Sequence, residues 1–183
     1  MFKLRDPFKT ITGLKSGVFI MAALIFSSLA YAQSDKQDFI DARKCHVIER
    51  LQTIYDKKTF TQDRFLALSK KNNPSDYVQC LFQDNDTKLL CEVSSGYYAK
   101  VGGATVLHSA VYLKTLKRLN FSTDSSKGNF QRMFDINKKS DFIGVSEALL
   151  SALFELHGAR LDTELVWKAP LAPTGSKTCS PVS

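Results

Sequence analysis

The residues of this chain with the clearest capacity for chemistry are its four cysteines, Cys45, Cys80, Cys91 and Cys179. Cys80 and Cys91 lie in two apolar runs on either side of the polar turn 84–87. If these runs pair as antiparallel strands about the middle of the turn, the two cysteines stand opposite each other and a disulfide can join them. Zinc sites need closely spaced ligand pairs such as Cys-x-x-Cys, and the chain has none, so we expect no metal.

The length of the turn decides how well this pair suits a disulfide. If all of 84–87 is loop, Cys80 and Cys91 fall at a non-hydrogen-bonded pair, where side chains are closer. If only Asn85 and Asp86 turn, the cysteines fall at a wider pair. The alternative is two reduced cysteines that pack as small apolar residues. We expect the disulfide, which leaves Cys45 and Cys179 as a second pair joining the first helix to the tail.

No catalytic motif accompanies the cysteines. The histidines, His46, His108 and His157, lie within or beside predicted helices, and none belongs to a ligand pair such as His-Glu-x-x-His. The segment 144–148 begins like a nucleophile elbow, but it lacks the second glycine and lies inside a predicted helix. We therefore expect no enzymatic activity and no cofactor. A hydrolase, the remaining catalytic alternative, would require one of the histidines to meet a carboxylate in a pocket.

The first residues of the chain predict the compartment of the cysteines. Four basic residues precede the apolar, uncharged segment 17–32, which ends in Ala30-Tyr31-Ala32. This layout is typical of a secretory signal peptide (residues 1–32) that is cleaved after Ala32. The alternative is an uncleaved anchor, although the segment is short for a membrane span, which needs about 20 apolar residues. In both cases we expect a periplasmic or secreted protein, in which disulfides persist.

Composition limits the classes of partner. Cleavage would leave 151 residues, enough for one domain with a core, and would lower the formal charge from +7 to +4. The remaining charges of both signs are scattered, and the one basic cluster, at Lys114, Lys117 and Arg118, lacks interleaved aromatic residues. A nucleic-acid-binding protein would present a concentrated basic face. We therefore expect no nucleic-acid partner, and membrane contact only if the anchor is uncleaved.

The N-terminal part of the mature chain, 33–76, is predicted to be helical. A capping box at Ser34-Asp35-Lys36-Gln37 predicts a first helix that continues to about Asp56. A shorter helix is predicted over 61–70, and the turn-forming residues 72–76 would end it.

A β-hairpin is predicted to follow over 77–98. Its strands would oppose Val78 to Val93, Cys80 to Cys91 and Phe82 to Leu89 on one face, and Gln79 to Glu92 and Gln83 to Lys88 on the other. One register thus gives one apolar and one mostly polar face, which is how a half-buried antiparallel hairpin is specified.

Further helices and strands complete the predicted domain. The elements are a helix over 104–119 with Leu107, Val111, Leu116 and Leu119 inward, a loop over 122–129, a strand over 130–136, a helix from a Ser140 cap to Leu156 ended by Gly158, a strand over 164–169 and an irregular tail. Phe142, Val145, Leu149, Leu153 and Leu156 would line the core face of the last helix. Short antiparallel strands mixed with helices indicate an α+β domain.

The segment 77–170 resembles the TY-Chap N-terminal domain, of the type III secretion chaperone and YbjN-like class. The likeness lies in a Val-Gln strand start, a Glu-Val second strand, a Leu-x-x-Leu helix before an aromatic residue, and an Asn-aromatic-x-Arg strand at 129–132, in that order and spacing. The chain departs from the family pattern at Asn120-Phe121, where an aromatic residue after glycine is usual, and in its export segment and cysteine pair.

The resemblance implies a small antiparallel sheet packed against helices, type III secretion chaperone-like, that binds protein segments. It supplies no catalytic residues, and a homodimer is compatible with it because members of the wider class are often dimers. We therefore predict an exported, non-catalytic module that binds an unidentified peptide or protein client, with 171–183 as a tail. The alternatives are an envelope-associated structural protein held by an uncleaved anchor, and a hydrolase.

Overall fold

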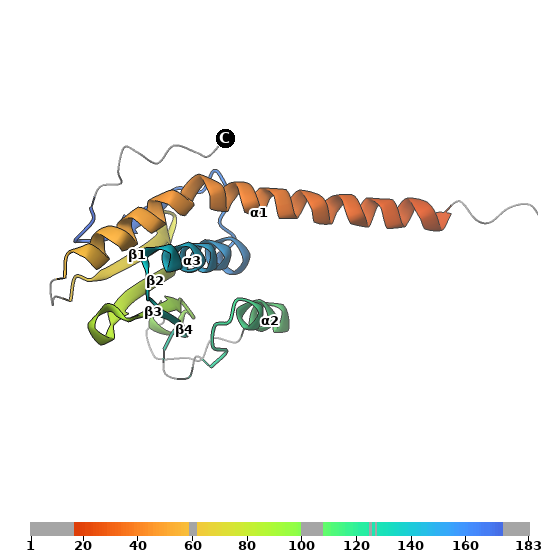
Figure 1. Ribbon diagram of the computed structural model, residues 1–183. Helices are drawn as coiled ribbons and strands as arrows, with labels where there is room; N and C mark the ends of the chain where they lie inside the picture. Colours follow the sequence, from red (N-terminus) through yellow and green to blue (C-terminus); the bar gives the residue numbers. More distant parts are fainter. Residues whose placement is uncertain (1–16, 59–61, 100–107, 125, 127, 174–183) are drawn as a thin grey trace, which may run out of the picture. The chain divides into compact units, whose positions relative to one another are not determined.

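The computed structural model describes residues 17–58, 62–99, 108–124, 126 and 128–173 of the chain. Residues 1–34 and 35–183 form two units. The described residues of the first unit belong to helix α1 (Gly17–Asp56), which continues into the second unit (Figure 1). Among the described residues, no helix has the combination of length and apolar character that crossing a membrane requires.

The second unit contains a five-stranded antiparallel sheet and helices, so the predicted α+β class is confirmed. The strands, in the spatial order β4-β3-β2-β1-β5, are β1 (Phe65–Lys70), β2 (Asn73–Gln83), β3 (Lys88–Val93), β4 (Phe130–Asp135) and β5 (Leu165–Lys168). Helix α2 (Ala110–Arg118) connects β3 to β4, and α3 (Phe142–His157) connects β4 to β5. Short 3-10 helices lie at Asp84–Asp86, Tyr97–Ala99 and Lys139–Asp141.

The hairpin of β2 and β3 has the predicted register, with Cys80 opposite Cys91. All of 84–87 lies between the strands, so the longer of the two expected loops is present. The Cα atoms of the two cysteines are 4.0 Å apart, which agrees with the closer, non-hydrogen-bonded type of pair, and the cysteines form a disulfide. Cys45 also takes part in a disulfide. Its predicted partner, Cys179, lies outside the described residues.

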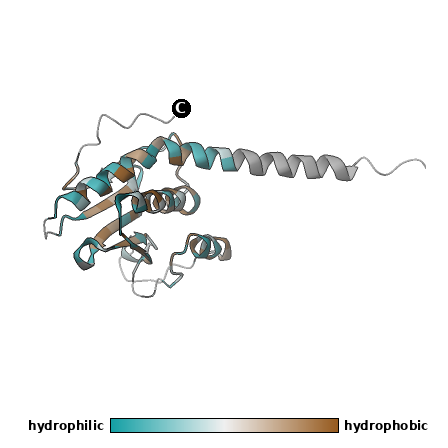
Figure 2. Cartoon of the chain, viewed as in Figure 1, coloured by the Kyte–Doolittle hydropathy of each residue, from teal (hydrophilic) through white to brown (hydrophobic). Residues whose placement is uncertain are grey.

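The core lies between the helices and one face of the sheet. Aromatic contacts join α1, α3 and the sheet within this core, because Tyr55 of α1 touches both Phe82 of β2 and Phe142 of α3. Apolar residues, brown in Figure 2, are concentrated along the strands and α3. Most helix-facing strand positions are fully buried, namely Leu66, Leu68, Val78, Cys80, Leu89, Cys91, Val93 and Phe130, and Phe82 and Phe134 on the same face are partly buried. Burial of these alternate positions is what the two-residue period of a strand predicts.

Helix α1 begins at Gly17, so the predicted helix start at Ser34 is wrong. A capping box marks the start of a helix only where the capping residue itself lies outside the helical conformation. The residues between Gly17 and Ser34 include no proline and no further glycine, and alanine and leucine among them are good helix formers. The hydrogen-bonded ladder therefore continues through Ser34.

The predicted short helix over 61–70 is also wrong, because 65–70 forms β1. Leu66 and Leu68 alternate with half-buried residues, and β1 lies between β2 and β5 with partners on both edges. This pairing with distant strands outweighs a weak local preference for helix. The predicted turn over 72–76 is shorter than expected, because β2 begins at Asn73 and a register shift next to Ser69 absorbs the extra residues.

Helix α2 begins at Ala110, with the side chain of Ser109 as its N-cap, and the predicted positions 104–107 lie outside the described residues. Leu116 and Leu119 are buried as predicted, whereas Val111 is 75% exposed and its predicted inward position is wrong. Because α2 begins at Ala110 and not at 104, its buried face is shorter than predicted. Val111 lies in the first turn of the helix, before the buried Leu116.

Helix α3 ends at Gly158 as predicted, and the residues expected on its core face are buried or, for Leu156, half-buried. Its predicted cap is wrong, because Ser140 lies inside the 3-10 turn Lys139–Asp141 that precedes the helix. Asp141 instead accepts hydrogen bonds from the backbone N–H groups of Asn137 and Lys138. Strands β4 and β5 match the predicted segments to within one residue at each end.

Candidate functional site

The face of the sheet that points away from the core is called the open face below. Four apolar side chains form one row across it, which we call the apolar row: Phe65, Leu81, Leu90 and Met133. Cross-strand pairing places each directly beside the next, since Phe65 pairs with Leu81, Leu81 with Leu90, and Leu90 with Met133. Leu81 is 37% exposed and Met133 is 48% exposed. The result is apolar surface that is continuous over four strands.

Polar side chains flank the apolar row on both sides. On the side toward the β2–β3 turn lie Gln83, Lys88 and Asp135, which are paired across the sheet. On the other side lie the polar residues Gln79, Glu92 and Gln131, and beyond Gln79 the row of pairs continues through the apolar Ala67 to Lys168. The Glu92 carboxylate accepts hydrogen bonds from Gln79 Nε2 at 2.5 Å and Gln131 Nε2 at 2.9 Å. The apolar row therefore has a fixed polar border, as many interaction surfaces do.

Two depressions adjoin the polar border, and Pro74 and Tyr77 line both. The larger, with a volume of about 490 Å³, extends over β1 and β5 to Phe65 and Val166. The smaller, of about 200 Å³, reaches Ser94 and Tyr98. Between them the Tyr77 hydroxyl accepts a hydrogen bond from Asn129 Nδ2 at 2.7 Å, and burial raises the pKa of this phenol. Tyr77 therefore stays neutral and fixed in place.

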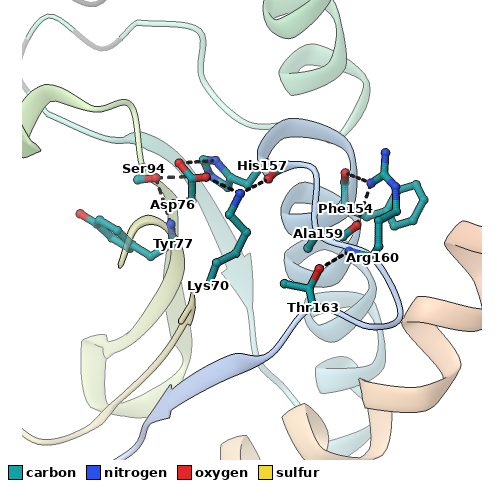
Figure 3. A network of polar contacts seen from close by, with 9 residues as sticks. All are labelled: Lys70, Asp76, Tyr77, Ser94, Phe154, His157, Ala159, Arg160 and Thr163. Carbon is teal, nitrogen blue, oxygen red and sulfur yellow. Dashed lines mark hydrogen bonds and ion pairs between the residues drawn. The ribbon is translucent and has the colours of Figure 1, made fainter. Parts of the chain in front are cut away.

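A polar network lies behind the smaller depression, and we call it the polar junction (Figure 3). His157, at the end of α3, places Nε2 3.3 Å from Ser94 Oγ and Nδ1 3.6 Å from Asp76 Oδ1. Lys70 Nζ forms an ion pair with Asp76 Oδ2 at 2.6 Å and donates to the His157 carbonyl at 2.7 Å. The polar junction thus joins the end of α3 to β1 and to the first residues of β2.

The side chains of Ser94, His157 and Asp76 contact one another in the order found in a hydrolytic triad. Three features of their geometry differ from those of a catalytic triad. Ser94 is 4% exposed, and its Oγ accepts the Tyr77 N–H at 3.1 Å, whereas a nucleophile must reach its substrate. The 3.6 Å from His157 to Asp76 is too long for the hydrogen bond that would orient the imidazole. Lys70 already neutralises the carboxylate. This geometry supports a structural role for the polar junction better than a catalytic one.

Burial sets the ionisation of the polar junction. Loss of water around the His157 imidazole is the main reason that its pKa falls to about 4; Asp76 opposes this change and the nearby Lys70 adds to it. Burial also lowers the pKa of His108, whose Nε2 is 3.1 Å from the Ser95 carbonyl, and raises that of Tyr112. Both histidines are therefore neutral at neutral pH.

The other sequence candidates lie apart from the open face. His46 packs its ring against Trp167, with centroids 6.2 Å apart. Ser146, in the segment that begins like a nucleophile elbow, is buried in α3 and donates to the Ile143 carbonyl. Cys80 and Cys91 lie on the buried side of the sheet. In the part of the chain that the structure describes, no three His, Cys, Asp or Glu side chains gather as metal ligands would.

Sequence reasoning missed both the apolar row and the polar junction. The predicted hairpin register already opposes Leu81 to Leu90, so half of the apolar row could have been found from that pair. Phe65 was assigned to a helix, and the pairing of Met133 with Leu90 depends on the position of β4. Asp76, Ser94 and His157 are far apart in the sequence, and only the fold brings them together.

Comparison with known proteins gives no further guide, because no protein family, curated protein or solved structure matches this chain.

Proposed function

We propose that the protein is an exported, non-catalytic binding module of chaperone-like fold that holds an apolar surface of a peptide or protein against its open face. The observation that carries this proposal is the apolar row. Burial of apolar surface is favourable by about 25 cal/mol per Å², so a contiguous apolar strip that is left open and bordered by polar groups is typical of an interaction site.

The dimensions of the open face suit a segment of a partner protein. Neighbouring strands are about 4.8 Å apart, so a row over four strands is about 14 Å long, room for three or four apolar side chains. The depression beside Tyr77 offers one further apolar recess, bounded by Phe65 and Val166. The amides of Gln79 and Gln131 lie alongside, where they can bond polar groups of the partner.

The hairpin disulfide supports the export part of the proposal. Disulfides form and persist in the periplasm and outside the cell, whereas thiols in the cytosol are kept reduced. The Cys80–Cys91 disulfide joins the central strand β2 to its neighbour β3, and these strands carry Leu81 and Leu90. It therefore stiffens the surface on which the partner would rest.

Site-specific photocrosslinking tests the proposal. A benzoyl-phenylalanine placed at position 81 or position 133 should give discrete crosslinked proteins in cells, because both positions belong to the apolar row. Position 111 is the matched control, since Val111 is an exposed apolar residue on α2. Equal crosslinking from position 111, or no crosslinks from positions 81 and 133, would contradict a binding role for the open face.

A further inference from the structure

We infer that the larger depression of the open face binds the C-terminus of a partner polypeptide that ends in an aromatic residue. The aromatic ring would lie on the floor of the depression, and the terminal carboxylate would lie beside the ammonium group of Lys168. The inference rests on the proposed function and narrows its partner from any apolar segment to one kind of chain end.

Strand pairing explains why the sheet is hollowed at this place. Ala67 and Ser69 of β1 form the floor of the depression, because both side chains are small. Larger side chains stand opposite them on both neighbouring strands, namely Gln79 and Tyr77 on β2, and Lys168 and Val166 on β5. Small residues between two rows of larger ones leave a trough along β1.

Side chains also close the two ends of this trough. Phe65 lies two residues before Ala67 and therefore on the same face of β1. At the other end, Pro74 follows Asn73, which pairs with Lys70 at the end of β1. An extended segment that crossed the depression would have to pass over these side chains, whereas the end of a chain needs only one entrance.

The size and lining of the depression suit an aromatic side chain. Its volume of about 490 Å³ falls within the range of about 300 to 1,000 Å³ that is typical of ligand pockets. Phe65, Ala67, Pro74, Tyr77 and Val166 make most of the lining apolar or aromatic. The rings of Phe65 and Tyr77 can contact a further ring edge to face, which is a preferred arrangement of aromatic pairs.

The polar groups of the depression complement a carboxylate. Within the part of the chain that the structure describes, neither the Lys168 ammonium nor the Ser69 hydroxyl has a hydrogen bond or an ion pair. None of the lining residues is acidic, and the Gln79 amide already donates to Glu92. A carboxylate only accepts hydrogen bonds, so it would use both unpaired donors, and its bond to Lys168 would be charge-assisted.

A C-terminal aromatic residue carries its ring and its carboxylate on the same Cα atom. Lys168 pairs with Ala67, so the ammonium-bearing side chain starts about 5 Å from the floor of the depression. One residue can therefore place its ring on Ala67 and its carboxylate near Lys168. Capture of a chain end through its carboxylate is a recurrent mode of peptide recognition.

NMR titration of the isotope-labelled full chain tests the inference, with the synthetic peptide Gly-Ser-Gly-Phe as the probe. We expect the amide signals of Ala67, Ser69 and Val166 to shift, with a dissociation constant of about 1 mM or less. The same peptide with a C-terminal amide should bind about threefold more weakly, because it lacks the carboxylate. A peptide that ends in alanine, or one extended to Gly-Ser-Gly-Phe-Gly-Ser, should bind about tenfold more weakly.

Substitutions in the depression locate the probe. Ala67→Leu fills the floor and should weaken binding about tenfold. Lys168→Met keeps the apolar stem but removes the ammonium, so the free acid and the amide should bind this variant equally well. The matched control is Lys114→Met on α2, an exposed lysine outside the depression, which should leave the preference for the free acid unchanged. Thermal melting verifies that each variant is folded.

Three results would overturn the inference. The first is a titration in which the signals of Ala67, Ser69 and Val166 do not move. The second is a Lys168→Met variant that keeps the preference for the free acid. The third is equal binding of the extended peptide, because an internal aromatic residue would then be sufficient.

The failure of this inference differs from the failure of the proposed function. If position 81 gives crosslinks but the probe does not bind, the open face holds its partner by another feature and only this inference is wrong. If the probe binds but positions 81 and 133 give no crosslinks, the proposed role of the apolar row is wrong. If neither is observed, both proposals are wrong.

Discussion

The fold strongly changes the ionisation of His157. Only 6% of the side chain is exposed, and it sits between Ser94 and Asp76 with Lys70 close by. A neutral imidazole suits this buried position, because Asp76 already has a cationic partner in Lys70. The network holds the first residues of β2, where Pro74 and Tyr77 line both depressions of the open face.

The pH dependence of stability follows from this burial. The pKa of His157 is about 4 in the folded protein and near 6.5 when unfolded. Above pH 6.5 the imidazole is neutral in both the folded and the unfolded chain, so the free energy of unfolding does not change with its titration. Between pH 6.5 and 4 only the unfolded chain binds the proton, so the free energy of unfolding falls as the pH is lowered. The loss amounts to about 3 kcal/mol. Urea denaturation at pH 7.5, 5.5 and 4 should show this slope in the wild type and a flatter one in His157→Gln.

The His157→Gln variant will itself be less stable at neutral pH, so the slopes are compared and not the absolute stabilities. Parallel curves for the two proteins over pH 6.5 to 4 would show that another group causes the loss.

At the scale of elements, α3 shows how two glycines in one helix differ. Gly158 ends the helix with φ of 65°, a left-handed conformation in which a Cβ is strained. Gly144 lies within the helix, and open space surrounds the position that its Cβ would occupy. The same substitution should therefore have opposite effects at these two positions.

We expect Gly158→Ala to lower the free energy of unfolding by about 1 kcal/mol and Gly144→Ala to raise it by up to about 1 kcal/mol. Chemical denaturation of the two variants at pH 7.5 measures both changes. A gain in stability at Gly158 would show that α3 does not end in the left-handed conformation.

Pairing within the sheet explains which elements were mispredicted. β1 carries no β-branched residue, so its sequence resembles a helix as much as a strand, and it becomes a strand because β2 and β5 flank it. The hairpin of β2 and β3 was predicted correctly because its two strands are joined by a short loop. Its register follows from the alternation of apolar residues, which is a local property.

At the scale of the whole molecule, the described helices cover one side of the sheet and leave the apolar row on the other. A peptide or protein bound to the open face would stabilise the folded state by mass action, since it binds only the folded chain. The melting temperature of the wild type should therefore rise on addition of a protein that crosslinks to position 81, and this rise should be absent in Leu90→Asp. Differential scanning fluorimetry measures the midpoint, and a wild-type midpoint that the added protein leaves unchanged would contradict a binding role for the open face.

The sequence by itself determined the α+β class, the hairpin register with its disulfide, the buried face of α3 and its end at Gly158. These features depend on periodicity and on short-range geometry, which neighbouring residues encode. Only the tertiary structure decided that 65–70 is a strand, that Leu81 and Leu90 continue into a row with Phe65 and Met133, and that His157 meets Ser94 and Asp76. Strand order and the meeting of distant segments depend on packing over the whole chain, and no local pattern records them.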